Sequence, residues 1–158
     1  MKLIWTKNKL PASWLIREGL DEPVSHFAIV FDDHLVYHSN FVGVHLVPYV
    51  DFAEKNDIVY AIEIEMSLEE EETVYQELIK LYRKRNYDFG AFAYFAWCVL
   101  KKKVAGIPLP KTNKWGSSNE YLCTEMYTVL PKKYRKVELP RDIQLVSPYE
   151  LYKCISGS

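Results

Sequence analysis

All four histidines of the chain lie in one short stretch, and one of its three cysteines follows far downstream. The histidines are His26, His34, His38 and His45, and the cysteine of interest is Cys123. A neutral imidazole can remove the proton of a thiol, and a thiol at the start of a helix lies close to backbone amides that stabilise its anion. These residue types indicate nucleophilic catalysis by cysteine, with histidine as the general base.

The three cysteines differ in context. Cys98, Cys123 and Cys154 form no Cys-x-x-Cys pair, which is typical of a reducing compartment rather than of a disulfide scaffold. Cys98 lies in an aromatic run and Cys154 near the end of the chain, so we expect both to behave as small hydrophobic side chains. Before Cys123, Ser117 and Glu120 match a capping box, which predicts a helix start whose amides favour a thiolate and donate to an oxyanion.

The histidine stretch has the pattern of two strands joined by a turn. Residues 24–31 and 35–39 are rich in β-branched and aromatic side chains, and residues 32–34 have turn chemistry. A turn with an odd number of residues puts His26 and His38 on one face of this hairpin, whereas a two-residue turn separates them.

On a shared face, His38 can hold the His26 ring by a hydrogen bond, as the third member of a catalytic triad does. Glu63 and Glu65 share one face of the next predicted strand and are rival orienting groups. The third member is therefore left open between an imidazole and a carboxylate.

A zinc site is the alternative use of these residues. His34-x-x-x-His38 has a ligand-like spacing, and His26, His45 and Cys123 could complete a tetrahedral set. The chain has no Cys-x-x-Cys and no His-Glu-x-x-His, and a spacing of four puts ligands on one face only in a helix. We therefore expect no metal and no other cofactor, with His34 in the turn and His45 at the surface, both incidental to the chemistry.

The elements that follow are predicted from periodicity. Residues 58–66 alternate as a half-buried strand, and Ser67 and Glu70 form a capping box that starts a helix. The apolar run of residues 89–100 is closed by Lys101-Lys102-Lys103 and is shorter than the roughly 20 residues that span a bilayer. We expect a buried core helix here, and an interfacial membrane helix is the disfavoured alternative.

The two ends of the chain carry weaker signals. Residues 5–18 are expected to be irregular or short-helical, with Trp5 and Trp14 placed to shield a cleft. Residues 137–146 are predicted to add a last strand.

Composition bounds the class of protein. The chain has 158 residues, of which 49% are hydrophobic, and fits one domain over residues 1–158. Lys and Arg number 20 against 21 Asp and Glu, so global charge favours neither nucleic acid nor an anionic membrane as partner. The first residues show no apolar signal-peptide core, and we expect a cytoplasmic protein.

These residues resemble those of a known family. The stretches 25–31, 36–39, 43–44 and 121–126 look like the circularly permuted papain-like (NlpC-related) cysteine hydrolases, in which histidine precedes cysteine. The group includes the bacterial YiiX/YaeF-like proteins and, more distantly, the lecithin:retinol acyltransferase-like lipid enzymes. The twelve-residue spacing between the two histidines is that of the acyltransferase branch. The Cys-x-Glu sequence and residues 87–89 are more similar to the YiiX branch.

The resemblance implies an α+β, permuted papain-like fold with an antiparallel β-sheet packed against helices and the nucleophile at a helix N-terminus. It implies Cys123 as nucleophile, His26 as general base and acid, and His38 as the polar third member. The implied activity is hydrolysis of an amide of the peptide or peptidoglycan type, or of a related ester or thioester, through an acyl-enzyme. The implied substrates are a peptide, a peptidoglycan fragment or an acylated small molecule.

Two other functions remain open on this resemblance. A lipid acyltransferase or phospholipase would use the same triad, but the Asn-Cys-x-His-Phe box of that branch is absent because Leu122 stands in place of the asparagine. A non-catalytic binding module on the same fold would leave the cysteine unreactive. Membrane contact is not the favoured interpretation.

Overall fold

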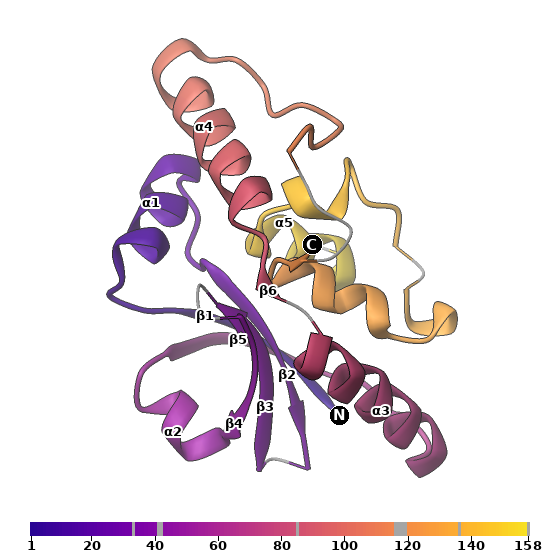
Figure 1. Cartoon of the computed structure of the whole chain (residues 1–158). Helices are drawn as coiled ribbons and strands as arrows, with labels where there is room; N and C mark the ends of the chain where they lie inside the picture. The colour runs from indigo at the N-terminus through magenta and orange to yellow at the C-terminus, as the bar shows by residue number, and fades with distance from the viewer. Residues whose placement is uncertain (33, 41–42, 85, 116–119, 136, 158) are drawn as a thin grey trace.

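The computed structural model describes residues 1–32, 34–40, 43–84, 86–115, 120–135 and 137–157. The elements in chain order are β1 (Lys2–Lys7), α1 (Pro11–Leu20), β2 (His26–Phe31), β3 (Leu35–Asn40), β4 (Gly43–Pro48), α2 (Tyr49–Ala53), β5 (Asp57–Glu63), α3 (Leu68–Lys84), β6 (Asn86–Tyr87), α4 (Phe89–Ala105), β7 (Glu120–Tyr121), the 3₁₀ helices η1 (Thr124–Val129), η2 (Lys132–Tyr134) and η3 (Ile143–Leu145), and α5 (Pro148–Ser156). The fold is α+β, with helices on both sides of an antiparallel sheet (Figure 1).

The main sheet has five strands in the order β4-β3-β2-β1-β5, and every neighbouring pair is antiparallel. The prediction that residues 5–18 are irregular or short-helical is confirmed in part by α1, but it is wrong for residues 5–7, which belong to β1. Residues 3–6 are buried on both faces of the sheet, so this strand shows no alternation of apolar and polar side chains. Trp5 packs in the core against Phe27 and Tyr152, with ring centroids 5.2 and 5.3 Å away, and shields no cleft.

The two faces of this sheet are covered unequally. On one face, Leu3, Phe27 and Ile29 pack beneath side chains of α3, η1 and α5. On the other face, Ile4 and Ala28 belong to a smaller cluster that is closed by Phe52 of α2. The thinner cover on the second face leaves room for a pocket over the start of β2, where Ser25 and His26 line it.

Helix α3 begins as predicted. The Ser67 hydroxyl accepts a hydrogen bond from the Glu70 amide at 3.3 Å, and the Glu70 carboxylate accepts one from the Ser67 amide at 3.2 Å. Val74 and Leu78 are buried, whereas Leu68 is 84% exposed, so the buried stripe starts more than one turn into the helix.

Helix α4 is the predicted core helix on one face only. Ala91, Phe95, Cys98 and Val99 are buried, a spacing that makes a single stripe along the helix. The opposite side is exposed, and α4 extends away from the sheet beyond the part that α1 covers (Figure 1). The prediction for Cys98 as a buried hydrophobic side chain is confirmed.

The last strand predicted over residues 137–146 is wrong. The described part of this segment is irregular apart from η3. The amide of Asp142 donates to the carbonyl of Lys111, so the chain is bonded to the loop after α4 instead of to the sheet, and Pro140 removes one of the donors a strand would need. Helix α5 begins at a capping box of Ser147 and Glu150, which is visible in the sequence.

Candidate active site

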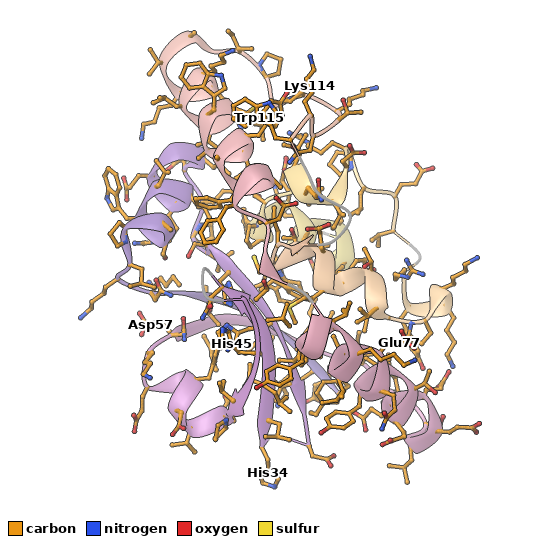
Figure 2. The ribbon with its side chains drawn as sticks, viewed as in Figure 1. His34, His45, Asp57, Glu77, Lys114 and Trp115 are labelled. Carbon is orange, nitrogen blue, oxygen red and sulfur yellow. The ribbon has the colours of Figure 1, made fainter. Side chains whose placement is uncertain are left out.

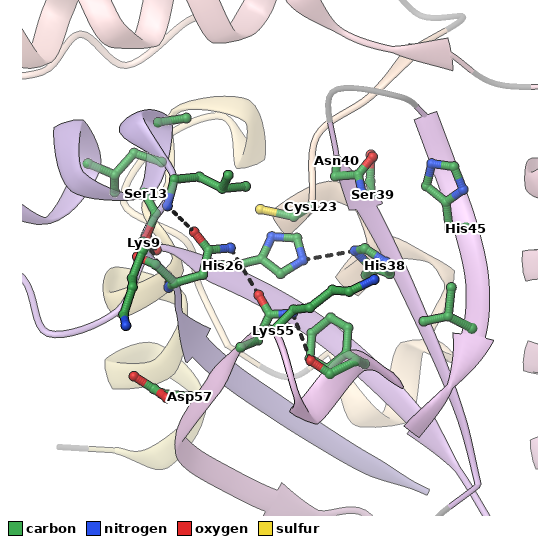
Figure 3. Close-up of a pocket in the computed structure, with 18 of the residues that line it drawn as sticks. Lys9, Ser13, His26, His38, Ser39, Asn40, His45, Lys55, Asp57 and Cys123 are labelled. Atoms are coloured by element: carbon green, nitrogen blue, oxygen red, sulfur yellow. Dashed lines mark hydrogen bonds between the residues drawn. The ribbon is translucent and has the colours of Figure 1, made fainter. Parts of the chain in front are cut away.

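The β2–β3 hairpin brings His26 and His38 together. Phe31 pairs with Leu35, so the connecting turn has three residues, and the hairpin prediction is confirmed. Ala28 lies directly opposite His38, which places His26 diagonally on the same face. His26 Nε2 lies 3.3 Å from His38 Nδ1, with the two rings at 89° to each other (Figure 3).

Phe52 fixes both imidazoles from the next layer. Its ring centroid lies 5.0 Å from that of His38 and 6.2 Å from that of His26, and its side chain is buried. It comes from α2, a five-residue helix that the sequence analysis missed. The only available signal was Pro48, which ends β4 and precedes the first helical residue.

Cys123 reaches the same place from a distant part of the chain. β6 and β7 form a two-stranded parallel sheet, which brings the start of η1 alongside the end of α3 and the start of α4. Cys123 is half-buried, and its side chain lies beside the His26 ring in the pocket (Figure 3).

The helix start at Cys123 differs from the prediction. Cys123 is the N-cap residue of η1, a six-residue 3₁₀ helix, and not a residue inside the first turns of an α-helix. Ser117 of the predicted capping box lies outside the described residues. The short helix gives the sulfur fewer aligned peptide dipoles than an α-helix of ordinary length would give.

Glu125 fixes the turn around Cys123 instead. The Leu122 amide donates to Glu125 Oε2 at 2.7 Å, and Gln144 Nε2 donates to Glu125 Oε1 at 3.0 Å. The carboxylate is buried and thus ties the residue before the cysteine to the residue two positions after it. The Cys-x-Glu sequence was the signal for this positioning role.

Burial dominates the electrostatics of the three side chains. It raises the pKa of the Cys123 thiol to about 11, while backbone amides of Phe27, Thr124 and Cys123 itself act in the opposite direction. Burial lowers the pKa of His26 to about 4, and burial with the neighbouring imidazoles lowers the pKa of His38 to about 3. The predicted bias toward a thiolate is therefore wrong for the free protein, because desolvation outweighs the amides.

His45 is closer to the pair than predicted. It lies directly opposite His38 across β3 and β4, with ring centroids 5.8 Å apart, and it lines the pocket. Within the described residues, its Nε2 is buried without a hydrogen-bond partner. His34 is exposed in the turn at the end of the hairpin, as expected (Figure 2).

The rival orienting carboxylates lie elsewhere. Glu63 and Glu65 line a separate hollow with Met1 and Lys2, and Glu63 Oε1 lies 3.7 Å from Lys2 Nζ. Neither glutamate is among the residues that line the pocket of Cys123. Of the third-member candidates, only His38 contacts His26.

The residues of the alternative zinc site do not all lie together. In the part of the chain that the structure describes, no group of three or more His, Cys, Asp or Glu side chains is arranged to hold a metal ion. His34 lies outside the pocket that His26, His38, His45 and Cys123 line.

The pocket has a volume of about 830 Å³. One wall is a hydrogen-bond chain in which Ser13 Oγ donates to the Asn8 carbonyl at 2.9 Å, Asn8 Nδ2 to Asn56 Oδ1 at 2.9 Å, and Asn56 Nδ2 to the Phe52 carbonyl at 2.9 Å (Figure 3). Charged side chains of both signs also line the pocket: Lys9, Lys55, Asp51, Glu54 and Asp57. The pocket can therefore contact a ligand through apolar, amide and charged groups.

The chain matches no protein-family model, and no curated protein and no solved structure is significantly similar to it. None of the described helices is long and apolar enough to cross a membrane.

Proposed function

We propose that this protein is a thiol hydrolase with Cys123 as nucleophile, His26 as general base and acid, and His38 as the orienting third member. The observation that carries the proposal is that three side chains from β2, β3 and the start of η1 line one pocket, with His26 next to both of the others. We propose in addition that the fold is a permuted papain-like one, since histidine on the sheet precedes a cysteine at a helix start.

The contact between the imidazoles assigns their protons. With a pKa of about 3, His38 is neutral near neutral pH, so its Nδ1 can accept a hydrogen bond from His26 Nε2. His26 then carries its proton on Nε2, which leaves the lone pair of Nδ1 for the thiol. This is the tautomer that a general base beside Cys123 needs.

The reaction then proceeds from a neutral pair. As Cys123 Sγ bonds to the substrate carbonyl carbon, its proton passes to His26 Nδ1. The tetrahedral intermediate collapses with cleavage of the C–N or C–O bond, and the leaving group takes that proton. Water, deprotonated by His26, then attacks the thioester carbonyl carbon. The C–S bond breaks, and Cys123 Sγ takes the proton back from His26. Backbone amides of Phe27, Cys123 and Thr124, which lie near the sulfur, are the candidate donors to the oxyanion.

The pocket favours a polar acyl substrate. The side-chain amides of Asn8 and Asn56 can form hydrogen bonds with peptide groups of a substrate. The pocket also presents positive charge from Lys9 and Lys55 and negative charge from Asp51. A peptide-like amide with charged groups of both signs fits this lining better than a long alkyl chain does.

A binding module is the second candidate function. The raised pKa of the Cys123 thiol and the lowered pKa of His26 are what a buried, unreactive pair would also show. The two functions differ in whether an acyl-directed electrophile that occupies the pocket modifies Cys123.

Probe labelling separates them. A panel of peptidyl acyloxymethyl ketones is incubated with a Cys98→Ser/Cys154→Ser background, and the mass of the adduct is measured over time. We expect a single adduct on Cys123, and a rate that falls by at least about 100-fold in His26→Ala. His34→Ala, which alters an exposed histidine of the same hairpin, is the matched control. It should label as fast as the Cys98→Ser/Cys154→Ser protein does. Absence of labelling by every probe, or equal rates in His26→Ala, would support the binding module.

A further inference from the structure

The distal part of α4 and the loop after it expose large apolar side chains. The exposed fractions are Trp97 49%, Leu100 47%, Val104 79%, Ile107 50% and Trp115 57%. We call residues 97–115 the α4 tip. Single exposed apolar residues are ordinary on a protein surface, but a run of them along one helix end and its loop indicates an interaction surface.

The charge of this region is as uneven as its hydropathy. Residues 89–115 contain none of the chain's 21 acidic residues but five of its 20 basic ones. These five are exposed and belong to the α4 tip: Lys101, Lys102, Lys103, Lys111 and Lys114. The near-zero net charge of the whole chain thus conceals a local excess of positive charge.

The α4 tip has a defined structure. Gly106 ends the helix in the left-handed conformation with φ +68°, and the loop then returns along α4. The Asn113 amide donates to Asp142 Oδ2 at 3.0 Å, and the Trp115 ring lies 5.3 Å from that of Tyr94. A Cβ at Gly90 would lie 2.7 Å from the Trp115 carbonyl oxygen, so a glycine there permits the close approach of the loop. Figure 2 shows Lys114 and Trp115 beside the projecting helix.

We propose that the α4 tip binds the surface of an anionic lipid bilayer. Tryptophan prefers the boundary between headgroups and acyl chains, and valine, leucine and isoleucine enter the outer acyl region. Lysine side chains beside them reach lipid phosphates, and Lys101 Nζ already lies 4.9 Å from the Trp97 ring centroid. The helix lies on the bilayer rather than across it, in agreement with the absence of a spanning helix among those described.

Charge favours a lipid surface over a second copy of the chain. Two copies that met through the α4 tip would bring lysine clusters together without any carboxylate from the tip itself to separate them. Anionic headgroups complement both the charge and the exposed apolar side chains.

The inference goes beyond the proposed hydrolase and does not depend on it. Phe92, on the same helix, lines the pocket, and Leu100 is two turns further along, about 12 Å at 1.5 Å per residue. Bilayer binding would therefore hold the pocket close to the membrane. A Cys123→Ala variant should bind vesicles as the unaltered protein does, so failure of the catalytic proposal leaves this result unaffected.

Vesicle co-sedimentation of the full chain tests the proposal. Vesicles of phosphatidylcholine alone are compared with vesicles that contain one third phosphatidylglycerol, at low and at high salt. We expect binding to the anionic vesicles that weakens with salt. Lys101→Glu/Lys102→Glu should reduce it by at least about 30-fold, since each lysine near the surface contributes roughly 1 kcal/mol. Lys80→Glu/Lys132→Glu makes the same change in net charge on exposed residues elsewhere and should bind normally.

A second pair of variants tests the apolar part. Val104→Ser/Ile107→Ser should weaken binding at least about 10-fold, whereas Leu68→Ser/Val50→Ser, at equally exposed positions away from the tip, should not. All four substitutions are at exposed sites, and thermal melts confirm that each variant is folded. The proposal is overturned if anionic vesicles are not bound or if the tip and control variants bind equally. It is also overturned if the tip substitutions abolish a dimer or nucleic-acid binding while vesicle binding is unchanged.

Discussion

The histidine side and the cysteine side of the candidate pair are built in different ways. His26 and His38 share one hairpin, and their relative position follows from the three-residue turn between β2 and β3. Cys123 arrives through pairing of β6 with β7 and is held by Glu125 and by packing of η1 against the sheet. Local register therefore determines the base and its orienting group, whereas tertiary structure alone determines whether the thiol meets them.

Breaking the register of the hairpin should have the largest effect. Deletion of His34 leaves a two-residue turn, so either His38 moves to the opposite face or the strand breaks its apolar pattern. We expect the free energy of unfolding to fall by about 4 kcal/mol or more, with loss of Cys123 labelling. Urea denaturation and adduct mass measure the two effects.

His34→Gly keeps the turn length and is the control for this deletion. It should label normally and lose less than about 1 kcal/mol, because His34 is exposed. If the deletion variant retained both stability and labelling, the number of residues in the turn would not determine whether His26 and His38 share a face.

The pH dependence of stability tests the histidine side of the site. His26 has a pKa of about 4 in the folded protein against an ordinary 6.5, so the unfolded state binds the proton more tightly. Its contribution is complete above pH 6.5 and is lost as the pH falls toward 4, by on the order of 3 kcal/mol at roughly 1.4 kcal/mol per pKa unit. Burial raises the pKa of Glu22 to about 7, which has the opposite sign and adds stability as the pH falls from 7 to 4.5.

The variant His26→Gln isolates the contribution of His26. Both proteins contain Glu22, so its contribution cancels when their free energies of unfolding are subtracted. As the pH falls from 7 to 4, the unaltered protein should lose stability relative to His26→Gln. Urea denaturation at each pH measures this difference in the free energy of unfolding. Parallel curves over this range would mean that His26 titrates normally in the folded state.

Removal of the Glu125 carboxylate tests the cysteine side. Glu125→Ala leaves the buried Leu122 amide without its acceptor, and we expect a loss of about 2 kcal/mol with slower labelling of Cys123. Glu125→Gln retains one carbonyl acceptor for that amide and should restore most of both. If Glu125→Ala lowers stability while the labelling rate is unchanged, Glu125 stabilises the fold but does not position the thiol.

The smallest effect is expected at the turn. Asp32 adopts φ +47°, a conformation that is strained for a residue with a Cβ. Asp32→Gly should therefore change the free energy of unfolding by no more than about 1 kcal/mol, with a gain if relief of strain exceeds the added entropy of the unfolded chain. A loss of several kcal/mol would show that the Asp32 side chain has a structural role of its own.

The same contrast explains which parts of the structure the sequence predicted. The hairpin, the capping box of α3 and the pairing of His26 with His38 depend on neighbours in the chain and were predicted. β1 was missed because its residues are buried on both faces, and the segment 137–146 was misassigned because its alternation comes from packing of a loop. Phe52 contacts the site only after distant segments come together, so no spacing rule could assign it. Glu125 was indicated by the Cys-x-Glu sequence, but its bond to Gln144 depends on a distant segment.

The pKa of Cys123 was predicted wrongly for the same reason. The expected low pKa of Cys123 rested on a helix start seen in the sequence, whereas the raised value comes from residues that cover the sulfur in the folded protein. The exposed side of α4 was likewise hidden from the sequence, since an apolar run does not show which of its faces has a neighbour.

The most direct measurement of the central claim is the intact mass of the protein during turnover of activated acyl esters and peptide thioesters. The account predicts a transient acyl adduct on Cys123 that accumulates within the first turnover and then hydrolyses. This adduct should be absent in Cys123→Ala and should form at least about 100-fold more slowly in His26→Ala. A substrate that is hydrolysed without an adduct, or at the same rate in Cys123→Ala, would contradict the account.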